Sequence, residues 1–175
     1  RGLAIGWLRL AVGSLMVAGV FSLLVAVART PAVQGFVGEE YFRVSLVGHV
    51  TFSLNVWSLS FAGVLWTLAS ARIGARHNRK VGRVSLWLAS AGAAAMAGLS
   101  AVGLGKPSLV DYIPTLEHPA FAAGLALFFV GVGLCAINYL MAMRSNMARL
   151  SVDSKALGIA AIAYLSAVIT LIIAF

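Results

Sequence analysis

Charged residues are scarce in this sequence of 175 residues: Asp, Glu, Lys and Arg together make up 10%, whereas hydrophobic residues make up 61%. The mean hydropathy is +0.98. A soluble domain needs a polar shell around its core, and this composition does not provide one. The scarcity of charge therefore excludes a soluble globular domain and indicates that the lipid bilayer is the solvent of the chain.

The sequence has a single cysteine, and its apolar runs contain no carboxylate of the kind that proton transport uses. The single cysteine, Cys135, lies in the middle of an apolar run, which excludes an intramolecular disulfide and a thiolate metal cluster. None of the acids falls inside an apolar run, and this disfavours a proton pump or a proton-coupled transporter. Phosphate-binding loops and the CxxC and HExxH motifs are also absent.

Five long apolar runs are what the sequence does contain, at approximately residues 4–28, 44–71, 82–104, 119–143 and 156–175. A helix needs roughly 20 apolar residues to cross about 30 Å of hydrocarbon. The runs lack two-residue alternation, which disfavours the strands of an outer-membrane barrel. The sequence predicts one all-α domain, residues 1–175, that is a polytopic bundle of five transmembrane helices.

The basic residues indicate an orientation. Ten of the thirteen fall in the N-terminal segment and in the second and fourth connections: Arg1, Arg9, Arg72, Arg76, Arg79, Lys80, Arg83, Arg144, Arg149 and Lys155. The alternate connections hold Arg29, Arg43 and Lys106, together with Glu39, Glu40, Asp111 and Glu117. By the positive-inside rule we expect a cytoplasmic N-terminus, an outer C-terminus and a bacterial inner-membrane location. Because the positive charge is confined to particular connections, it does not indicate a nucleic-acid partner.

The two ends of the sequence carry separate expectations. The first run is longer than the apolar core of a signal peptide, so we expect a retained helix. The sequence begins without a methionine and ends at Phe175 inside an apolar run, and an incomplete chain is one interpretation of both ends.

His49 is the clearest candidate functional residue, because it lies inside the second run, roughly 8 Å below its start. Ionisable residues within membrane spans default to functional hypotheses. One interpretation is a histidine satisfied by polar groups of neighbouring helices. The other is ligation of a haem iron, with the second ring nitrogen bonded to Ser45, and with Gly48 and Gly63 leaving room for a flat macrocycle against the backbone.

The other two histidines lie outside the runs. His118 directly precedes the fourth run, which crosses the membrane in the same direction as the second, so His49 and His118 are expected on the same side. They are either two axial ligands of one iron or unrelated, with His118 an interfacial histidine near Glu117. His77 is expected to be a solvated loop residue.

Glycine recurs in the third and fourth runs, at Gly92, Gly98, Gly124, Gly131 and Gly133. Small residues let membrane helices approach closely, so we expect helix packing at these positions. Pro119 is compatible with the first turn of a helix.

Two stretches carry a resemblance to a known family. Residues 41–52 (YFRVSLVGHVTF) are an aromatic entry into a helix with a histidine about one and a half turns in. Residues 112–121 (YIPTLEHPAF) form a second helix entry. In this order they resemble the amino-terminal five-helix part of the haem-copper oxidase catalytic subunit, most like its B-type branch, over most of the chain.

The resemblance implies that His49 is an axial ligand of a low-spin haem. The family's other haem ligands and its copper-binding histidines come from later helices, which are not present in this sequence. We therefore expect a haem-binding subunit of a respiratory-type electron-transfer complex, with haem b, no copper and no oxygen-reducing centre. The second axial ligand would come from His118 or a partner chain, and the expected partners are other membrane subunits and a periplasmic electron-transfer protein. The alternative is a cofactor-free membrane anchor or assembly subunit.

Overall fold

The computed structural model describes residues 2–33, 36, 38–73, 78–109, 113–146 and 150–174. Five spans in these ranges are long and apolar enough to cross a membrane, which confirms the predicted all-α multi-pass bundle. They are α1 (Gly2–Ala28), a second span formed by α2 (Glu39–Val50), η1 (Thr51–Val56) and α3 (Trp57–Arg72), then α4 (Arg79–Val102), α5 (Pro119–Arg144) and α6 (Val152–Ala174). His77, Asp111, Tyr112, Arg1, Arg76 and Arg149 lie outside the described residues.

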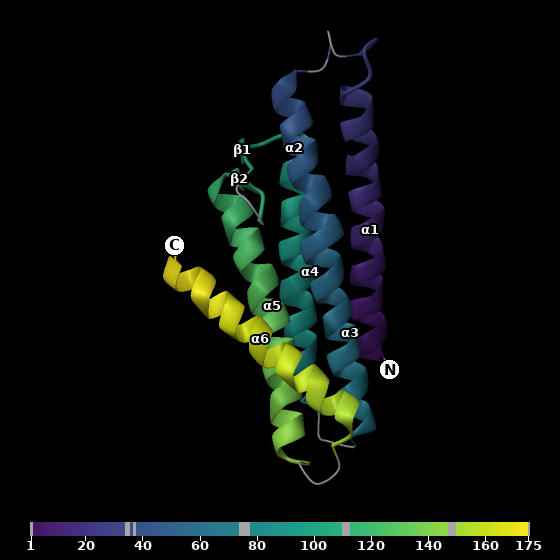
Figure 1. Ribbon diagram of the computed structural model, residues 1–175, viewed down its shortest axis with the longest axis vertical. Helices are drawn as coiled ribbons and strands as arrows, with labels where there is room; N and C mark the ends of the chain where they lie inside the picture. Colours follow the sequence, from purple (N-terminus) through teal and green to yellow (C-terminus); the bar gives the residue numbers. More distant parts are fainter. Residues whose placement is uncertain are drawn as a thin grey trace.

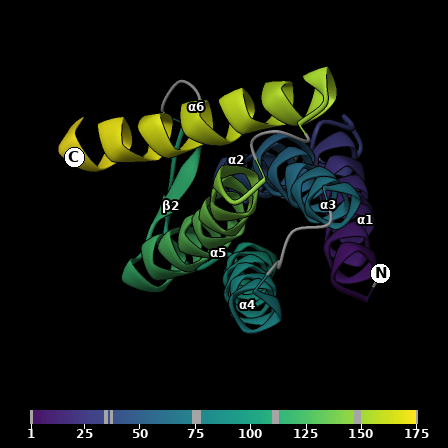
Figure 2. The same cartoon turned by 90° about the horizontal axis from the view of Figure 1, so that it is seen from below.

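The first four spans stand roughly side by side, and α6 crosses them obliquely (Figures 1 and 2). Seen from below, α6 runs along one flank of the bundle, past α3 and α5, while α1 lies on the far side of α3 (Figure 2). The main contacts are α4 with α5, and α1 with α2 and α3. This arrangement places His49, on α2, beside α1.

Glycines set the distance between α4 and α5, as the sequence predicts for three of the five positions. A Cβ on Gly92 would lie 2.6 Å from the backbone nitrogen of Phe128, and one on Gly131 would lie 2.5 Å from that of Ala89. A Cβ on Gly124 would lie 3.1 Å from the carbonyl oxygen of Gly92. A Cβ at Gly98 would meet nothing within 4 Å, so the prediction does not hold there. Gly133 is buried and packs against α6, where a Cβ would make only ordinary contacts with Leu165.

Local signals account for the helix ends. Asn78 precedes α4, and its side chain accepts hydrogen bonds from the backbone nitrogens of Lys80 and Val81. Gly103, with φ of 68°, ends the same helix in the left-handed conformation. The second span begins at Glu39 rather than near residue 44, because acidic residues in the first turn favour a helix N-terminus.

A π-helical segment, η1, interrupts the second span directly after α2. Buried residues recur every fourth position through it: Val44, Gly48, Phe52, Val56 and Ser60. In a regular α-helix four residues turn by about 400°, so this set would rotate by about 160° over sixteen residues. The wider π-helical turn accommodates about one extra residue, which offsets ~100° of this rotation. The five residues therefore stay on one buried face.

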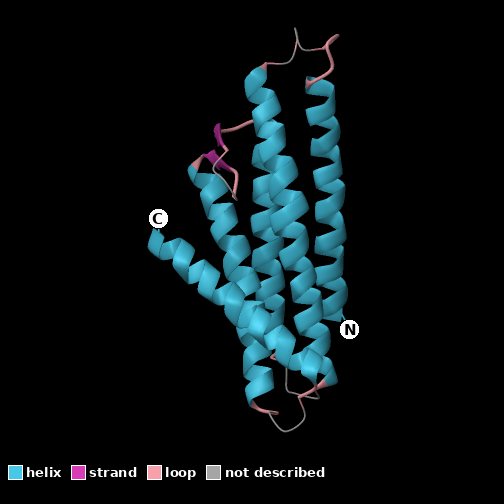
Figure 3. Ribbon diagram, viewed as in Figure 1, coloured by secondary structure: helices cyan, strands magenta, loops and turns pink. Residues whose placement is uncertain are grey.

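A short β-hairpin, which the sequence pattern does not predict, joins α4 to α5 (Figure 3). Strand β1 (Lys106–Ser108) pairs antiparallel with β2 (Thr115–Glu117). Leu116 of β2 is buried, and the hydroxyl of Thr51 donates to the carbonyl oxygen of Pro114 at 3.3 Å. The hairpin is therefore bonded to the first residue of η1.

Three aromatic side chains attach α6 to the bundle. Trp66 of α3 donates its indole N–H to the carbonyl oxygen of Leu157 at 3.1 Å. Tyr139 of α5 donates its hydroxyl to the carbonyl oxygen of Ser154 at 2.7 Å. In the reverse direction, Tyr164 of α6 donates to the carbonyl oxygen of Phe129 at 2.9 Å.

Candidate functional site

The half-buried ring of His49 lies near the end of α2, two residues before η1. Its Nδ1 is 3.0 Å from the carbonyl oxygen of Ala18 on α1. The two residues are 31 positions apart in the sequence, so this contact depends on the packing of α1 against α2. The expected acceptor was Ser45, on the same helix as His49; the observed one is a backbone group of the neighbouring helix.

The chemistry of this contact identifies which ring nitrogen carries a proton. A carbonyl oxygen can only accept a hydrogen bond, so Nδ1 of His49 must be the donor. In the neutral ring, Nε2 then keeps its lone pair. An Nδ1–H bond to a backbone carbonyl is the usual support for a histidine that binds a metal through Nε2. His49 is therefore held in a form that is able to ligate iron.

Room for a macrocycle at Gly48 and Gly63 was the second expectation, and it is wrong. The ring of Phe21 lies 2.9 Å from where a Cβ on Gly48 would be. The ring of Trp7, which is fully buried, lies 2.6 Å from the corresponding position on Gly63. Both aromatic residues belong to α1, so the glycines serve the packing of α1 on the second span. The α1 side of His49 is filled by protein.

His118 has a structural task of its own. Its Nδ1 accepts a hydrogen bond from the backbone nitrogen of Ala120 at 3.2 Å and so caps the N-terminus of α5. Because a backbone N–H only donates, Nδ1 holds the lone pair, and the proton of the neutral ring is on Nε2. In this conformation neither ring nitrogen of His118 is available to an iron.

The hydrogen bonds of the two histidines are with different elements of the bundle. The ring of His49 points to α1, whereas α5, which His118 caps, packs mainly on α4, α3 and α6. Among the described residues no group of three or more His, Cys, Asp or Glu side chains is arranged to hold a metal ion. His77 lies outside those residues.

Two polar atoms near η1 were not singled out by sequence reasoning. The amide nitrogen of Asn55, inside η1, and the hydroxyl of Ser60, one turn later, are buried and have no hydrogen-bond partner within the described part of the chain. Buried polar atoms without partners are uncommon and call for a reason. Asn55 lies on the π-helical segment itself and Ser60 lies just after it on α3, and π-helical turns are frequent at functional sites.

An open cavity of about 450 Å³ lies at the other end of α2, away from His49. It is lined by Glu39, Glu40, Arg43, Lys106 and Pro107, and Arg43 forms an ion pair with Glu39 at 2.6 Å. A lining of four charged side chains is unsuited to a largely apolar macrocycle. This cavity is therefore not a haem pocket.

Comparison with known proteins finds relatives but no function. The chain matches no family model and no solved structure. It is 38% identical over 134 residues to an uncharacterized protein of Aquifex aeolicus (strain VF5), covering 77% of this chain and 33% of that protein. It is 28% identical over 162 residues to the uncharacterized protein RP382 of Rickettsia prowazekii (strain Madrid E), covering 80% of this chain and 31% of that protein. The chain thus spans about a third of the length of the curated relatives it matches.

Proposed function

We propose that this chain is a haem-binding membrane subunit of a respiratory-type electron-transfer complex, with His49 as one axial ligand of the iron. The observation that carries the proposal is the 3.0 Å contact between Nδ1 of His49 and the carbonyl oxygen of Ala18. This contact leaves the lone pair of Nε2 free, and the His49 side chain is half-buried within a membrane span. The resemblance of residues 41–52 to the haem-copper oxidase family supports the same role.

His49 supplies a ligand but not the rest of a haem site. Phe21 and Trp7 fill the space at Gly48 and Gly63, so the macrocycle would lie on a side of His49 that α1 does not cover. Because His118 uses its Nδ1 to cap α5, we assign the second axial ligand to a partner chain or to a further segment of a longer polypeptide. A haem held there would supply one-electron transfer between an electron-transfer protein and a partner subunit.

Visible spectroscopy tests the proposal. Protein purified in mild detergent from its native membrane is expected to show the reduced-minus-oxidised bands of a low-spin haem b. His49→Ala should abolish them, and His118→Ala, the matched control, should leave the band positions unchanged. A folded His49→Ala protein with the full haem spectrum would show that His49 is not the ligand.

A rescue experiment separates ligation from structural support. In His49→Gly the side chain is replaced by a space that free imidazole can enter, so added imidazole should restore the low-spin bands. It should not do so in His49→Phe, where the space stays filled. Failure of imidazole to restore the bands in a folded His49→Gly protein would favour a histidine whose task is the bond to Ala18 alone.

One observation favours a second candidate, a cofactor-free membrane anchor or assembly subunit. The side chains of α1 complete the packing of the second span without any other group, since Trp7 is fully buried and Phe21 is 4% exposed. This candidate predicts that natively purified protein, isolated with its partner subunits, contains no haem. Quantitative haem extraction from the native complex distinguishes the two functions.

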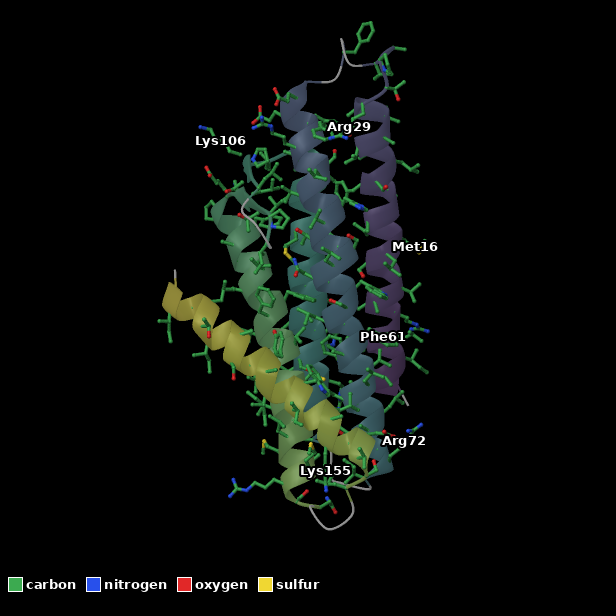
Figure 4. The ribbon with its side chains drawn as sticks, viewed as in Figure 1. Met16, Arg29, Phe61, Arg72, Lys106 and Lys155 are labelled. Atoms are coloured by element: carbon green, nitrogen blue, oxygen red, sulfur yellow. The ribbon has the colours of Figure 1, made fainter. Side chains whose placement is uncertain are left out.

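We also propose the orientation indicated by the positive-inside rule, with the N-terminus cytoplasmic and the membrane a bacterial inner membrane. Arg72 and Lys155 belong to the ten basic residues expected on the cytoplasmic side, and they lie at one end of the bundle. Arg29 and Lys106, from the other three, lie at the opposite end (Figure 4). A cysteine at Arg79 should resist impermeant labels in intact cells, and one at Lys106 should react. The reverse pattern would overturn the orientation.

A further inference from the structure

Helices α1 and α4 run side by side from the end of the bundle that carries most of the basic residues. They meet where the side chain of Leu86 occupies the space that a Cβ on Gly6 would need. The two helices cross in the same direction, because a single span separates them in the chain (Figure 1). The contact therefore fixes the relative depth of every residue along this seam.

Three arginines flank the contact and form what we call the arginine seam: Arg9, Arg79 and Arg83. Residues three or seven positions apart share a helix face. Arg9 follows Gly6 by three positions, and Arg83 and Arg79 precede Leu86 by three and seven, so all three side chains start beside the contact, on its side away from the buried faces of α1 and α4. At about 1.5 Å per residue, Arg9 lies roughly 9 Å deeper along the bundle than Arg83. All three arginines are exposed.

Among the described residues, no carboxylate belongs to the part of the bundle where the arginine seam lies. Glu39, Glu40 and Glu117 lie at the opposite end of the bundle, and Asp153 begins α6, which packs on α5 and α3. Within the described residues, Arg9, Arg79 and Arg83 form no ion pair. An arginine inside a membrane span is costly unless an anion or the interface satisfies it, so this seam calls for a negative partner.

Above the contact the seam is open. Gly13 follows Gly6 by seven positions and so returns to the same face of α1. A Cβ on Gly13 would meet no atom within 4 Å, and Gly13 is partly exposed. The seam therefore combines a cationic lower part with an unfilled apolar upper part, which matches the division of a phospholipid into headgroup and acyl chain.

We propose that the arginine seam is a binding site for an anionic phospholipid. Its phosphate lies between Arg9 and Arg83, and an acyl chain runs along α1 past Gly13. A lipid is the occupant rather than a free phosphate, because Arg9 lies inside a membrane span, where the phosphate must be attached to an apolar chain. The site does not depend on the proposed function.

Native mass spectrometry of the detergent-purified protein tests the site through dissociation constants for individual lipids. Dioleoylphosphatidylglycerol should bind more tightly than dioleoylphosphatidylcholine. Near a membrane surface each basic residue strengthens binding to anionic lipid roughly fivefold, so Arg9→Gln and Arg83→Gln should each weaken phosphatidylglycerol binding by about that factor. Arg144→Gln removes the same charge at the same end of the bundle, on α5, and should have no comparable effect.

A steric variant checks the acyl part separately. Gly13→Leu places a side chain where the structure has open space, so it should leave stability unchanged and weaken phosphatidylglycerol binding severalfold. Equal weakening by Arg9→Gln and Arg144→Gln would indicate diffuse attraction and would overturn the site. So would equal affinity for the two lipids, or displacement of the lipid by millimolar inorganic phosphate.

Discussion

Replacement of Gly92 by alanine should separate α4 from α5 and destabilise the bundle. The added Cβ would meet the carbonyl oxygen of Gly124 and lie 2.6 Å from the backbone nitrogen of Phe128. Ordinary contacts begin near 3.4 Å, so the helices must part by at least ~0.8 Å. Backbone atoms cannot rotate away as a side chain can. Overpacking of this kind costs about 1–3 kcal/mol, which exceeds the gain of up to ~1 kcal/mol from placing alanine in a helix.

Gly98 provides the matched control, because it lies on the same helix and a Cβ there would meet nothing within 4 Å. Gly98→Ala should raise the free energy of unfolding by up to ~1 kcal/mol, since only the helix propensity changes. Both variants can be compared by circular dichroism during titration of detergent-solubilised protein with SDS. If Gly92→Ala were as stable as Gly98→Ala, the reasoning from the close approach of the helices would be refuted.

Three further outcomes follow from hydrogen bonds and from the histidine content. Thr51→Val should lower the free energy of unfolding by about 1 kcal/mol, because it removes the bond to the Pro114 carbonyl, whereas Thr170→Val, at an exposed site, should stay within about 0.5 kcal/mol of the parent in the same titration. Asn138→Ala should cost about 1–3 kcal/mol, since its amide both donates to the backbone oxygen and accepts from the backbone nitrogen of Asn78; an unchanged midpoint would contradict this. The isolated chain, supplied with haem and an electron donor, should consume no oxygen at an electrode, because three histidines cannot supply both a haem ligand and a copper site.

The five spans were predictable because the length of an apolar run directly reflects the thickness of the bilayer. The close approach at Gly92, Gly124 and Gly131 was predictable for a similar reason, since small residues in lipid serve packing. It was not predictable that Gly98 contacts no other helix, because the rotation of α4 about its axis is set by α5. Composition alone does not record that rotation.

The surroundings of His49 were less accessible to sequence reasoning. Its hydrogen-bond acceptor is the backbone carbonyl of Ala18, and a backbone group has no signature in the sequence. The same applies to Phe21 against Gly48, which depends on the register of α1 along the second span. The π-helical turn shows only in the structure, where buried positions recur every fourth residue from Val44 to Ser60. That spacing is too long for a straight α-helix, but glycine and serine are among the buried residues, so hydrophobicity along the sequence does not display it.

The attachment of α6 has a consequence for how this protein can diverge. The acceptors on α6, at Leu157 and Ser154, are backbone carbonyl oxygens, which any amino acid provides. The donors are the side chains of Trp66 and Tyr139, on α3 and α5. Substitutions at Ser154 and Leu157 therefore leave these two acceptors in place, whereas loss of Trp66 or Tyr139 removes one of the three bonds that attach α6. Among divergent sequences, Trp66 and Tyr139 should therefore be more constrained than the residues at positions 154 and 157, which are limited only by the space available to their side chains.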